Sequence, residues 1–219
     1  MRIAVFLIVF LMCNLLKAQP VSLHPENPHY LLYHGEPVII ISSGEHYGAV
    51  INLDFDFIKY LNTLQKEGMN YSRLFSGFYM ETPEQFGIKF NSLAPNPLRL
   101  SIPWARSSEA GYKNGGNKFN LDIWDEEYFS RLKLFVGEAG KRNIIVEMVL
   151  FTSIYNEENW KINPFNPSNN INKINLNDFR KVNTISDTLI LDYQDKMVRK
   201  IIRELNSFDN LIYEIQNEP

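Results

Sequence analysis

The stretch that decides the fold is LIYEIQNEP, residues 211–219. Its first part, Leu211 to Ile215, has the apolar and aromatic character of a buried β-strand. The strand runs directly into Asn217 and Glu218, an amide beside a carboxylate. Parallel α/β folds place functional side chains at this position, the carboxyl tip of a strand. The stretch therefore predicts an α/β fold with polar chemistry at the end of this strand.

The preceding chain alternates between helix-like and strand-like segments. Apolar residues at helical spacing predict helices over residues 52–68, 125–140 and 192–206, the first capped by Asn52 or Asp54. Strands are predicted over residues 38–41, 69–77, 144–151 and 211–215. The first strand is also the second arm of a hairpin that starts at Tyr30, and its β-branched composition predicts burial on both faces. This alternation indicates a parallel sheet.

The loops differ in length according to the direction of the connection. Helix-to-strand connections take a few residues, whereas the strand-to-helix connections at about 77–120 and 152–187 are far longer than the usual two to six or so. Long loops at the carboxyl ends of strands favour a (β/α)8 TIM barrel, of which four βα units are recognisable after the hairpin. A dinucleotide-binding fold is disfavoured, because SSGEHYGA, residues 42–49, lacks the G-x-G-x-x-G turn.

Paired carboxylates cleave glycosidic bonds, one protonating the leaving oxygen while the other attacks the sugar or activates water. Glu218 at a strand tip suits the first role. The weaker candidates are Glu45 at the end of the first strand, Glu81 beyond the second, and Glu147 and Glu214 within strands. Carboxylates within strands are more often satisfied by a basic partner.

Three segments of the chain resemble the cellulase-like, family 5-like retaining glycoside hydrolases of clan A. IYEIQNEP, residues 212–219, is similar to the clan's fourth strand, which ends in Asn-Glu. GMNYSRLFSG, residues 68–77, is similar to its second strand, and NPHYLLYHGEPVIIISSGEHYG, residues 27–48, to its hairpin and first strand. The resemblance covers most of residues 19–219 and implies the amino-terminal half of a catalytic barrel.

The resemblance also implies roles for individual residues. Glu218 would be the acid/base, Asn217 would bind the substrate's 2-hydroxyl, and Arg73 would support the nucleophile. From the residues alone, Arg73 could instead pair with Glu147 or Glu214. The nucleophile of this clan ends the seventh strand, so it is expected to lie outside these 219 residues. A β-linked polysaccharide or oligosaccharide is the expected substrate, with no metal or organic cofactor.

Substrate contacts are expected from the region of the barrel mouth. The resemblance places His46 near the cleft, and flat aromatic faces in the long loops can stack on sugar rings. The expected substrate-binding residues are His46, Tyr47, Phe78, Trp104, Tyr155 and Trp160.

The amino terminus and composition limit the class of protein. Residues 1–18 combine Arg2, an apolar run and Ala18 before Gln19, which predicts a cleaved signal peptide and a secreted or periplasmic protein without a stable membrane span. The only cysteine, Cys13, lies in that segment, so disulfides and cysteine-ligated zinc are not expected in the mature chain. The net charge of −3 becomes more negative on loss of Arg2 and Lys17, which argues against nucleic-acid binding.

Two other interpretations remain open from the sequence. One is a non-catalytic carbohydrate-binding protein on the same scaffold. The other is an inactive truncated half-barrel, because four βα units alone would leave open strand edges.

Overall fold

The computed structural model describes residues 19–42, 45–176 and 178–219. The predicted signal peptide, residues 1–18, lies outside the described residues. The described chain divides into two compact units, one ending at Ile39 and the other comprising residues 40–219. None of the helices in the described ranges is long and apolar enough to cross a membrane.

The first unit contains a small antiparallel sheet with the strand order β1-β2-β3. Its strands are β1 Ser22–Leu23, β2 Leu31–Tyr33 and β3 Glu36–Val38. The predicted hairpin is therefore confirmed, but its second arm is shorter and begins earlier. The two residues between β2 and β3, His34 and Gly35, have φ values of 53° and 83°, the left-handed region that two-residue hairpin turns need.

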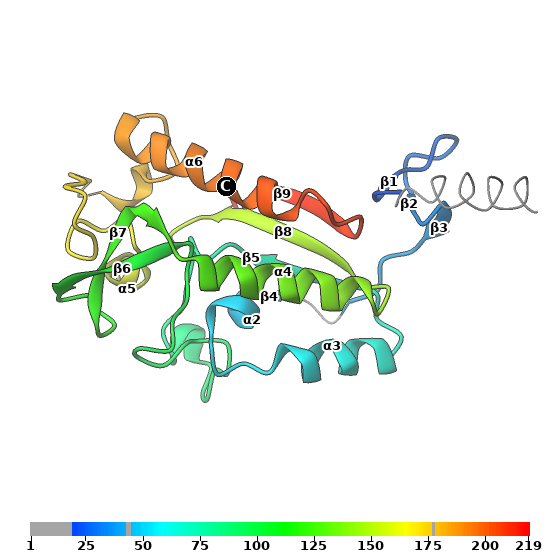
Figure 1. Ribbon diagram of the computed structural model, residues 1–219, viewed down its shortest axis with the longest axis horizontal. Helices are drawn as coiled ribbons and strands as arrows, with labels where there is room; N and C mark the ends of the chain where they lie inside the picture. Colours follow the sequence, from blue (N-terminus) through cyan, green and yellow to red (C-terminus); the bar gives the residue numbers. More distant parts are fainter. Residues whose placement is uncertain (1–18, 43–44, 177) are drawn as a thin grey trace, which may run out of the picture. The chain divides into compact units, whose positions relative to one another are not determined.

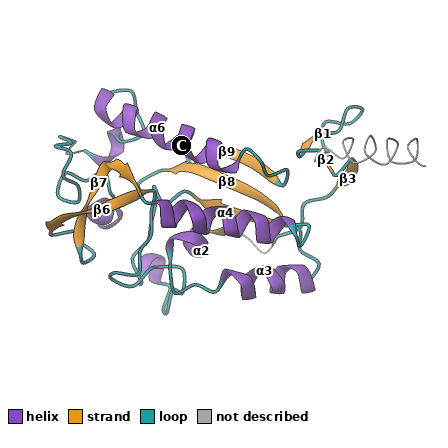
Figure 2. Ribbon diagram, viewed as in Figure 1, coloured by secondary structure: helices purple, strands orange, loops and turns teal. Residues whose placement is uncertain are grey.

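The second unit is built on a parallel sheet with the strand order β4-β5-β8-β9, seen in Figures 1 and 2. Its strands are β4 Glu45–His46, β5 Tyr71–Phe75, β8 Ile145–Thr152 and β9 Leu211–Asn217. The register places Arg73 beside Glu147 and Val149 beside Glu214. Within the described residues the sheet is open and does not close into a barrel.

The first parallel strand is not where the sequence predicted it. Ile39 and Ile41 are 67% and 53% exposed, so the expectation of a strand over residues 38–41 buried on both faces is wrong. Ile41 instead exchanges hydrogen bonds with Asn70, and the paired residues of β4 follow at Glu45 and His46. The β-branched residues 38–41 led to the prediction of a strand there. The residues that pair with β5 are the more polar Glu45 and His46 that follow.

Three helices run side by side across one face of the sheet (Figure 1). They are α3 Phe57–Lys66, α4 Glu126–Gly140 and α6 Thr188–Leu205. The apolar positions predicted for α4 are all buried, and so are Met197, Ile201 and Leu205 of α6. Ile202 was predicted to lie on the same apolar face but is 39% exposed, so the buried face of α6 is narrower than the sequence indicated.

Each of these helices begins at an aspartate whose carboxylate accepts backbone N–H groups. Asp125 accepts from Glu127 and Tyr128, and Asp187 caps α6 in the same way. Asp56 caps α3 through the N–H of Lys59, so neither Asn52 nor Asp54 is the cap. Asn52 lies instead at the end of the short helix α2, Gly48–Ile51, which follows β4.

The two long strand-to-helix loops are folded and carry their own elements. The loop after β5 contains η1 Gln85–Gly87 and an antiparallel hairpin formed by β6 Trp104–Ala110 and β7 Asn117–Trp124. The loop after β8 contains α5 Glu157–Ile162 and η2 Phe179–Lys181. Side chains of both loops, including Trp104 and Phe165, belong to the hydrophobic core. The hairpin is an element that the sequence patterns did not predict.

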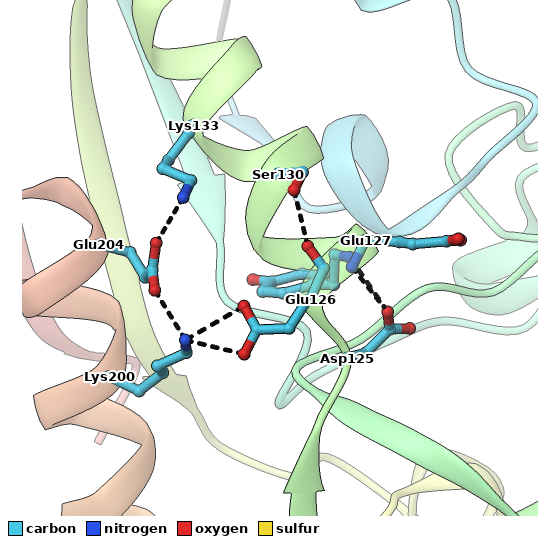
Figure 3. Close-up of polar contacts among 8 residues, drawn as sticks. Asp125, Glu126, Glu127, Ser130, Lys133, Lys200 and Glu204 are labelled. Atoms are coloured by element: carbon cyan, nitrogen blue, oxygen red, sulfur yellow. Dashed lines mark hydrogen bonds and ion pairs between the residues drawn. The ribbon is translucent and has the colours of Figure 1, made fainter.

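Helices α4 and α6 are joined by a chain of four charged side chains, drawn in Figure 3. Lys200 of α6 lies within 3.0 Å of Glu126 of α4 and 2.6 Å of Glu204. The other oxygen of Glu204 lies 2.6 Å from Lys133 on α4. The two lysines lower the pKa of Glu204, and the Lys200 ammonium also lies 4.7 Å from the Phe129 ring centroid. Glu204 thus carries a charge placed between two cations.

Arg131 of α4 forms hydrogen bonds to the backbone of the segment between α2 and α3. Its guanidinium donates to the carbonyls of Val50, Asn52 and Phe55 at 2.9–3.1 Å. Those carbonyls lie at and beyond the end of α2, where a helix leaves acceptors without partners. The same guanidinium lies over the Phe57 ring at 4.7 Å, which adds a cation–π contact at the start of α3.

We expect Arg131→Met to destabilise this chain by about 2–4 kcal/mol, because several half-buried carbonyls lose a charged donor at once. Arg131→Lys should cost less, since it keeps the charge but offers one donor point instead of a planar fork. Urea unfolding measures both. The control Lys66→Met, at an exposed side chain of α3, should change stability by less than about 0.5 kcal/mol. Equal effects of Arg131→Met and Lys66→Met would contradict the assignment.

Candidate active site

A cavity of about 350 Å³ lies at the carboxyl ends of the parallel strands. Residues at or just beyond the ends of all four strands line it: Tyr47 after β4, Phe75 at the end of β5, Thr152 at the end of β8, and Asn217 and Glu218 at β9. The long loops add the remaining lining residues, which are Tyr79, Glu81, Phe86 and Tyr155. The volume lies in the range of small-molecule sites, and the position is the one that α/β folds use for catalysis.

Glu218 and Asn217 are held by the loop after β8. The Tyr155 hydroxyl donates to the Glu218 carboxylate in a short hydrogen bond, and the Asn217 Nδ2 donates to the same Tyr155 oxygen at 3.0 Å. The Ser153 N–H donates to the Asn217 carbonyl at 3.3 Å, and the Ser153 hydroxyl to the Glu218 carbonyl. The carboxyl group of Glu218 therefore lies at the cavity beside a phenol and an amide.

Arg73 connects Asn217 to the charged residues of the sheet. Its Nη2 donates to Asn217 Oδ1 at 2.9 Å and also to the Glu214 carboxylate, which the Nε contacts at 3.1 Å. Glu147 lies 3.8 Å from the same Nε. The pairing of Arg73 with Glu214, one of the two alternatives open from the sequence, is thus present. Arg73 also orients the Asn217 side chain, because its hydrogen bond to Oδ1 fixes the positions of the amide oxygen and nitrogen.

Glu147 is the most perturbed carboxyl group near the site. Burial, followed by the charge and the hydrogen bond of neighbouring Glu214, raises its pKa to about 7. Arg73 donates two hydrogen bonds to Glu214 and lies 3.8 Å from Glu147, so the guanidinium is bound more closely to Glu214. The pair resembles carboxyl dyads in which one member stays protonated because two adjacent charges cannot both be stabilised.

The aromatic side chains of the cavity form a connected wall. Tyr79 meets Tyr47, Phe75 and Tyr155 with ring centroids 6.0, 6.4 and 5.5 Å away, and Phe86 meets Tyr155 at 6.0 Å. Tyr47, Tyr79 and Phe75 are buried, whereas Tyr155 and Phe86 are 37% and 65% exposed. The last two rings therefore have exposed surface that a flat, partly apolar ligand can cover.

The predicted substrate-binding residues fall into three groups. Tyr47 and Tyr155 line the cavity with Asn217 and Glu218. Phe78, Trp104 and Trp160 are 1%, 0% and 4% exposed and belong to the core instead. The backbone of His46 lies in β4 next to Leu74, but its side chain is outside the described part of the structure. Arg73 is not among the described lining residues, and its hydrogen bond to Asn217 connects it to the site.

Sequence reasoning did not select four of the lining residues: Phe75, Tyr79, Phe86 and Thr152. Phe75 and Thr152 could have been found, because each is the last residue of a parallel strand. Tyr79 and Phe86 lie in a loop without periodicity and carried no comparable signal. Glu81 was a weaker candidate from the sequence, and it lies in the cavity wall.

The described residues contain no cluster of three or more His, Cys, Asp or Glu side chains suited to a metal ion.

Glu147→Gln should flatten the pH dependence of stability. Because the folded state holds the Glu147 proton up to about pH 7, wild-type stability is full below the ordinary pKa of 4.5 and falls as the pH rises through 7. The expected loss is on the order of 2 kcal/mol between pH 5 and 8. Urea unfolding at several pH values measures it, with the exposed Glu109→Gln as control. Parallel pH profiles for wild type and Glu147→Gln would refute the assignment.

Comparison with known proteins identifies the fold. The sequence matches no protein-family model, and no curated protein is significantly similar to it. Solved structures do match. A glycoside hydrolase family 5 mannosidase from Rhizomucor miehei is 14% identical, with a TM-score of 0.54, over 92% of this chain and 49% of that chain. An endo-1,4-β-mannanase from the same organism is 11% identical, with a TM-score of 0.51, over 92% and 49%.

These matches confirm, at the level of the fold, the resemblance that the sequence segments indicated. The chain spans about half the length of the solved structures that it matches. It has an α/β fold similar to the TIM barrels of family 5 glycoside hydrolases, with an open parallel sheet in place of a closed barrel.

Proposed function

We propose that this chain carries the acid/base side of the active site of a retaining glycoside hydrolase. The observation that carries the proposal is the placement of Glu218 and Asn217 at the carboxyl end of β9, facing an aromatic-lined cavity. Glu218 would protonate the glycosidic oxygen as the bond breaks, and would later take the proton from the attacking water. The substrate class is a β-linked polysaccharide or oligosaccharide.

Asn217 and Arg73 act together in this mechanism. The Asn217 amide would donate to the sugar's 2-hydroxyl, a contact that strengthens in the transition state. Arg73 binds the carbonyl oxygen of that amide, so the Nδ2 donor is turned away from the guanidinium. Arg73 is therefore a positioning residue for Asn217. Support of the nucleophile, expected from the resemblance, would be an additional role.

The second carboxylate is proposed to lie outside these 219 residues. Retaining enzymes hold their two carboxyl groups about 5–5.5 Å apart, on opposite sides of the sugar. Since the chain covers about half of the matched barrels, the other half would supply the nucleophile. The predicted signal peptide supports export to the periplasm or the medium.

Replacing Glu218 with Ala in the full-length protein should lower kcat on unactivated glycosides by about 10²–10⁴-fold. Aryl glycosides with acidic leaving groups should lose far less, because such groups depart without protonation. Added azide should restore rate and yield a glycosyl azide, since it needs no general base. The substrate panel should include β-1,4-mannan, because matched structures include an endo-1,4-β-mannanase.

Glu67→Ala, at an exposed residue after α3, is the matched control and should leave kcat unchanged. Equal losses on activated and unactivated substrates would contradict the acid/base role. Sugar binding that persists in Glu218→Gln, with no turnover by the wild type, would favour a non-catalytic carbohydrate-binding protein.

The 219-residue chain on its own should show no glycosidase activity, because neither a glycosyl–enzyme intermediate nor its hydrolysis can proceed without the nucleophile. Assay of the purified chain with an activated aryl glycoside is the most sensitive measurement. Robust turnover that Glu218→Ala abolishes would show that the second carboxylate lies within this chain.

A further inference from the structure

Glu81 is a nearly buried carboxylate in the cavity wall to which the proposed mechanism gives no role. It lies in the loop after β5, is 9% exposed, and lines the same cavity as Glu218. Its carboxylate accepts hydrogen bonds from Tyr79 and Asn91. A buried carboxylate is costly unless it is well paired, and such groups are concentrated at functional sites.

Neighbouring polar side chains hold the Glu81 carboxylate in place. The Tyr79 hydroxyl donates to Oε1 at 2.9 Å, and the Asn91 Nδ2 lies 3.3 Å from Oε2. The same Nδ2 lies 2.6 Å from the Tyr47 hydroxyl. Burial and the neighbouring Glu81 charge raise the pKa of Tyr47 and of Tyr79, so both phenols stay protonated. A carboxylate accepts about four hydrogen bonds, which leaves Glu81 with acceptor capacity for a ligand.

The backbone on either side of Glu81 is also fixed. Buried amides of the loop after β8 donate to it: Asn163 to the Phe78 carbonyl at 2.9 Å, and Asn159 to the Met80 carbonyl at 3.2 Å. Further along the loop, the Leu93 carbonyl lies so close to Gly48 that a Cβ there would be 2.1 Å from it. The carboxylate is thus pre-organised by its loop, as a binding group should be.

The charges around the cavity restrict the ligand. Glu81 lines the cavity and repels anions, so an acidic sugar is disfavoured. A cationic amino sugar would stabilise the ionised form of a neighbouring general acid and so oppose proton donation. An uncharged sugar avoids both conflicts, and its hydroxyl groups are the donors that a carboxylate with free acceptor positions requires.

We propose that Glu81 is a substrate-binding residue that accepts hydrogen bonds from two adjacent hydroxyl groups of an uncharged sugar unit, whose face stacks on the exposed rings of Tyr155 and Phe86. Tyr79 and Asn91 are positioning residues for this carboxylate. The assignment rests on the proposed function for the choice of a sugar as ligand. It adds the residue that selects for neutral units with a vicinal diol.

The experiment compares the full-length wild type with Glu81→Gln, using a neutral β-linked oligosaccharide and its monodeoxy analogues. Glu81→Gln keeps the shape and removes the charge, and should raise KM and the calorimetric Kd about 10- to 100-fold, with kcat changed less than about threefold. Glu84→Gln, an exposed glutamate of the same loop, is the matched control and should behave like the wild type.

The deoxy analogues test the diol directly. In the wild type, removal of either of two adjacent hydroxyls should weaken binding by at least about tenfold, because Glu81 is left without a donor. In Glu81→Gln the same deletions should cost much less, which is the coupling that a direct contact produces. The wild-type series remains informative even if the variant fails to fold.

The outcomes separate this inference from the proposed function. Unchanged KM in Glu81→Gln, or no adjacent pair of sensitive hydroxyls in the wild type, overturns the inference while hydrolysis still supports the function. A fall in kcat at constant KM also overturns it, because Glu81 would then act on the reaction itself. Sugar binding that Glu81→Gln weakens, in a protein that hydrolyses nothing, supports the inference and refutes the function.

Discussion

The candidate site depends on one half-buried interaction, the contact of Arg73 with Glu214 and Asn217. Arg73 stands on β5 and its two partners on β9, with β8 between them. A guanidinium has the reach and the planar fork to bind a carboxylate and an amide oxygen together. This contact ties the strand that carries Glu218 to a strand two positions away in the sheet. It also aligns the Asn217 amide in a way that the backbone pairing of β8 with β9 does not impose.

The face of the sheet opposite the helices explains why charged groups occupy this position. Leu74 and Met148 face the helices and are fully buried, so alternation along the strands places Arg73 and Glu147 on the other face. Glu214 shares that face, because its register partner Val149 is two residues from Glu147. Burial and the neighbouring Glu214 raise the pKa of Glu147, and the Arg73 guanidinium binds the Glu214 carboxylate. These hydrogen-bonded residues lie on the face of the sheet below the cavity, and their opposite charges partly cancel.

The sequence predicted the helices, from their periodicity, and the site residues at strand ends, but few of the site residues in the loops. The helix over residues 126–140 was correct because its apolar residues recur at helical spacing and nothing competes with that pattern. Asn217 and Glu218 were found because strand tips are fixed by the sheet. The prediction of a buried strand at Ile39 and Ile41 was wrong, because β-branched composition indicates a strand but not its pairing partner. Trp104 and Trp160 were predicted to bind substrate because irregular loops have no periodicity that shows which side chains are buried. Their burial depends on contacts with residues far away in the sequence.

The charged residues of the sheet are not explained by stability. A buried ion pair often contributes no more to folding than apolar side chains of the same volume, since desolvation offsets most of the attraction. Apolar residues in place of Arg73, Glu147 and Glu214 would still fill this face of the sheet. They would leave Asn217 without a partner on its oxygen, and the amide could then rotate and present the wrong atom to a ligand. Under the proposed function, the network is the cost of fixing the Asn217 amide beside the Glu218 carboxyl group.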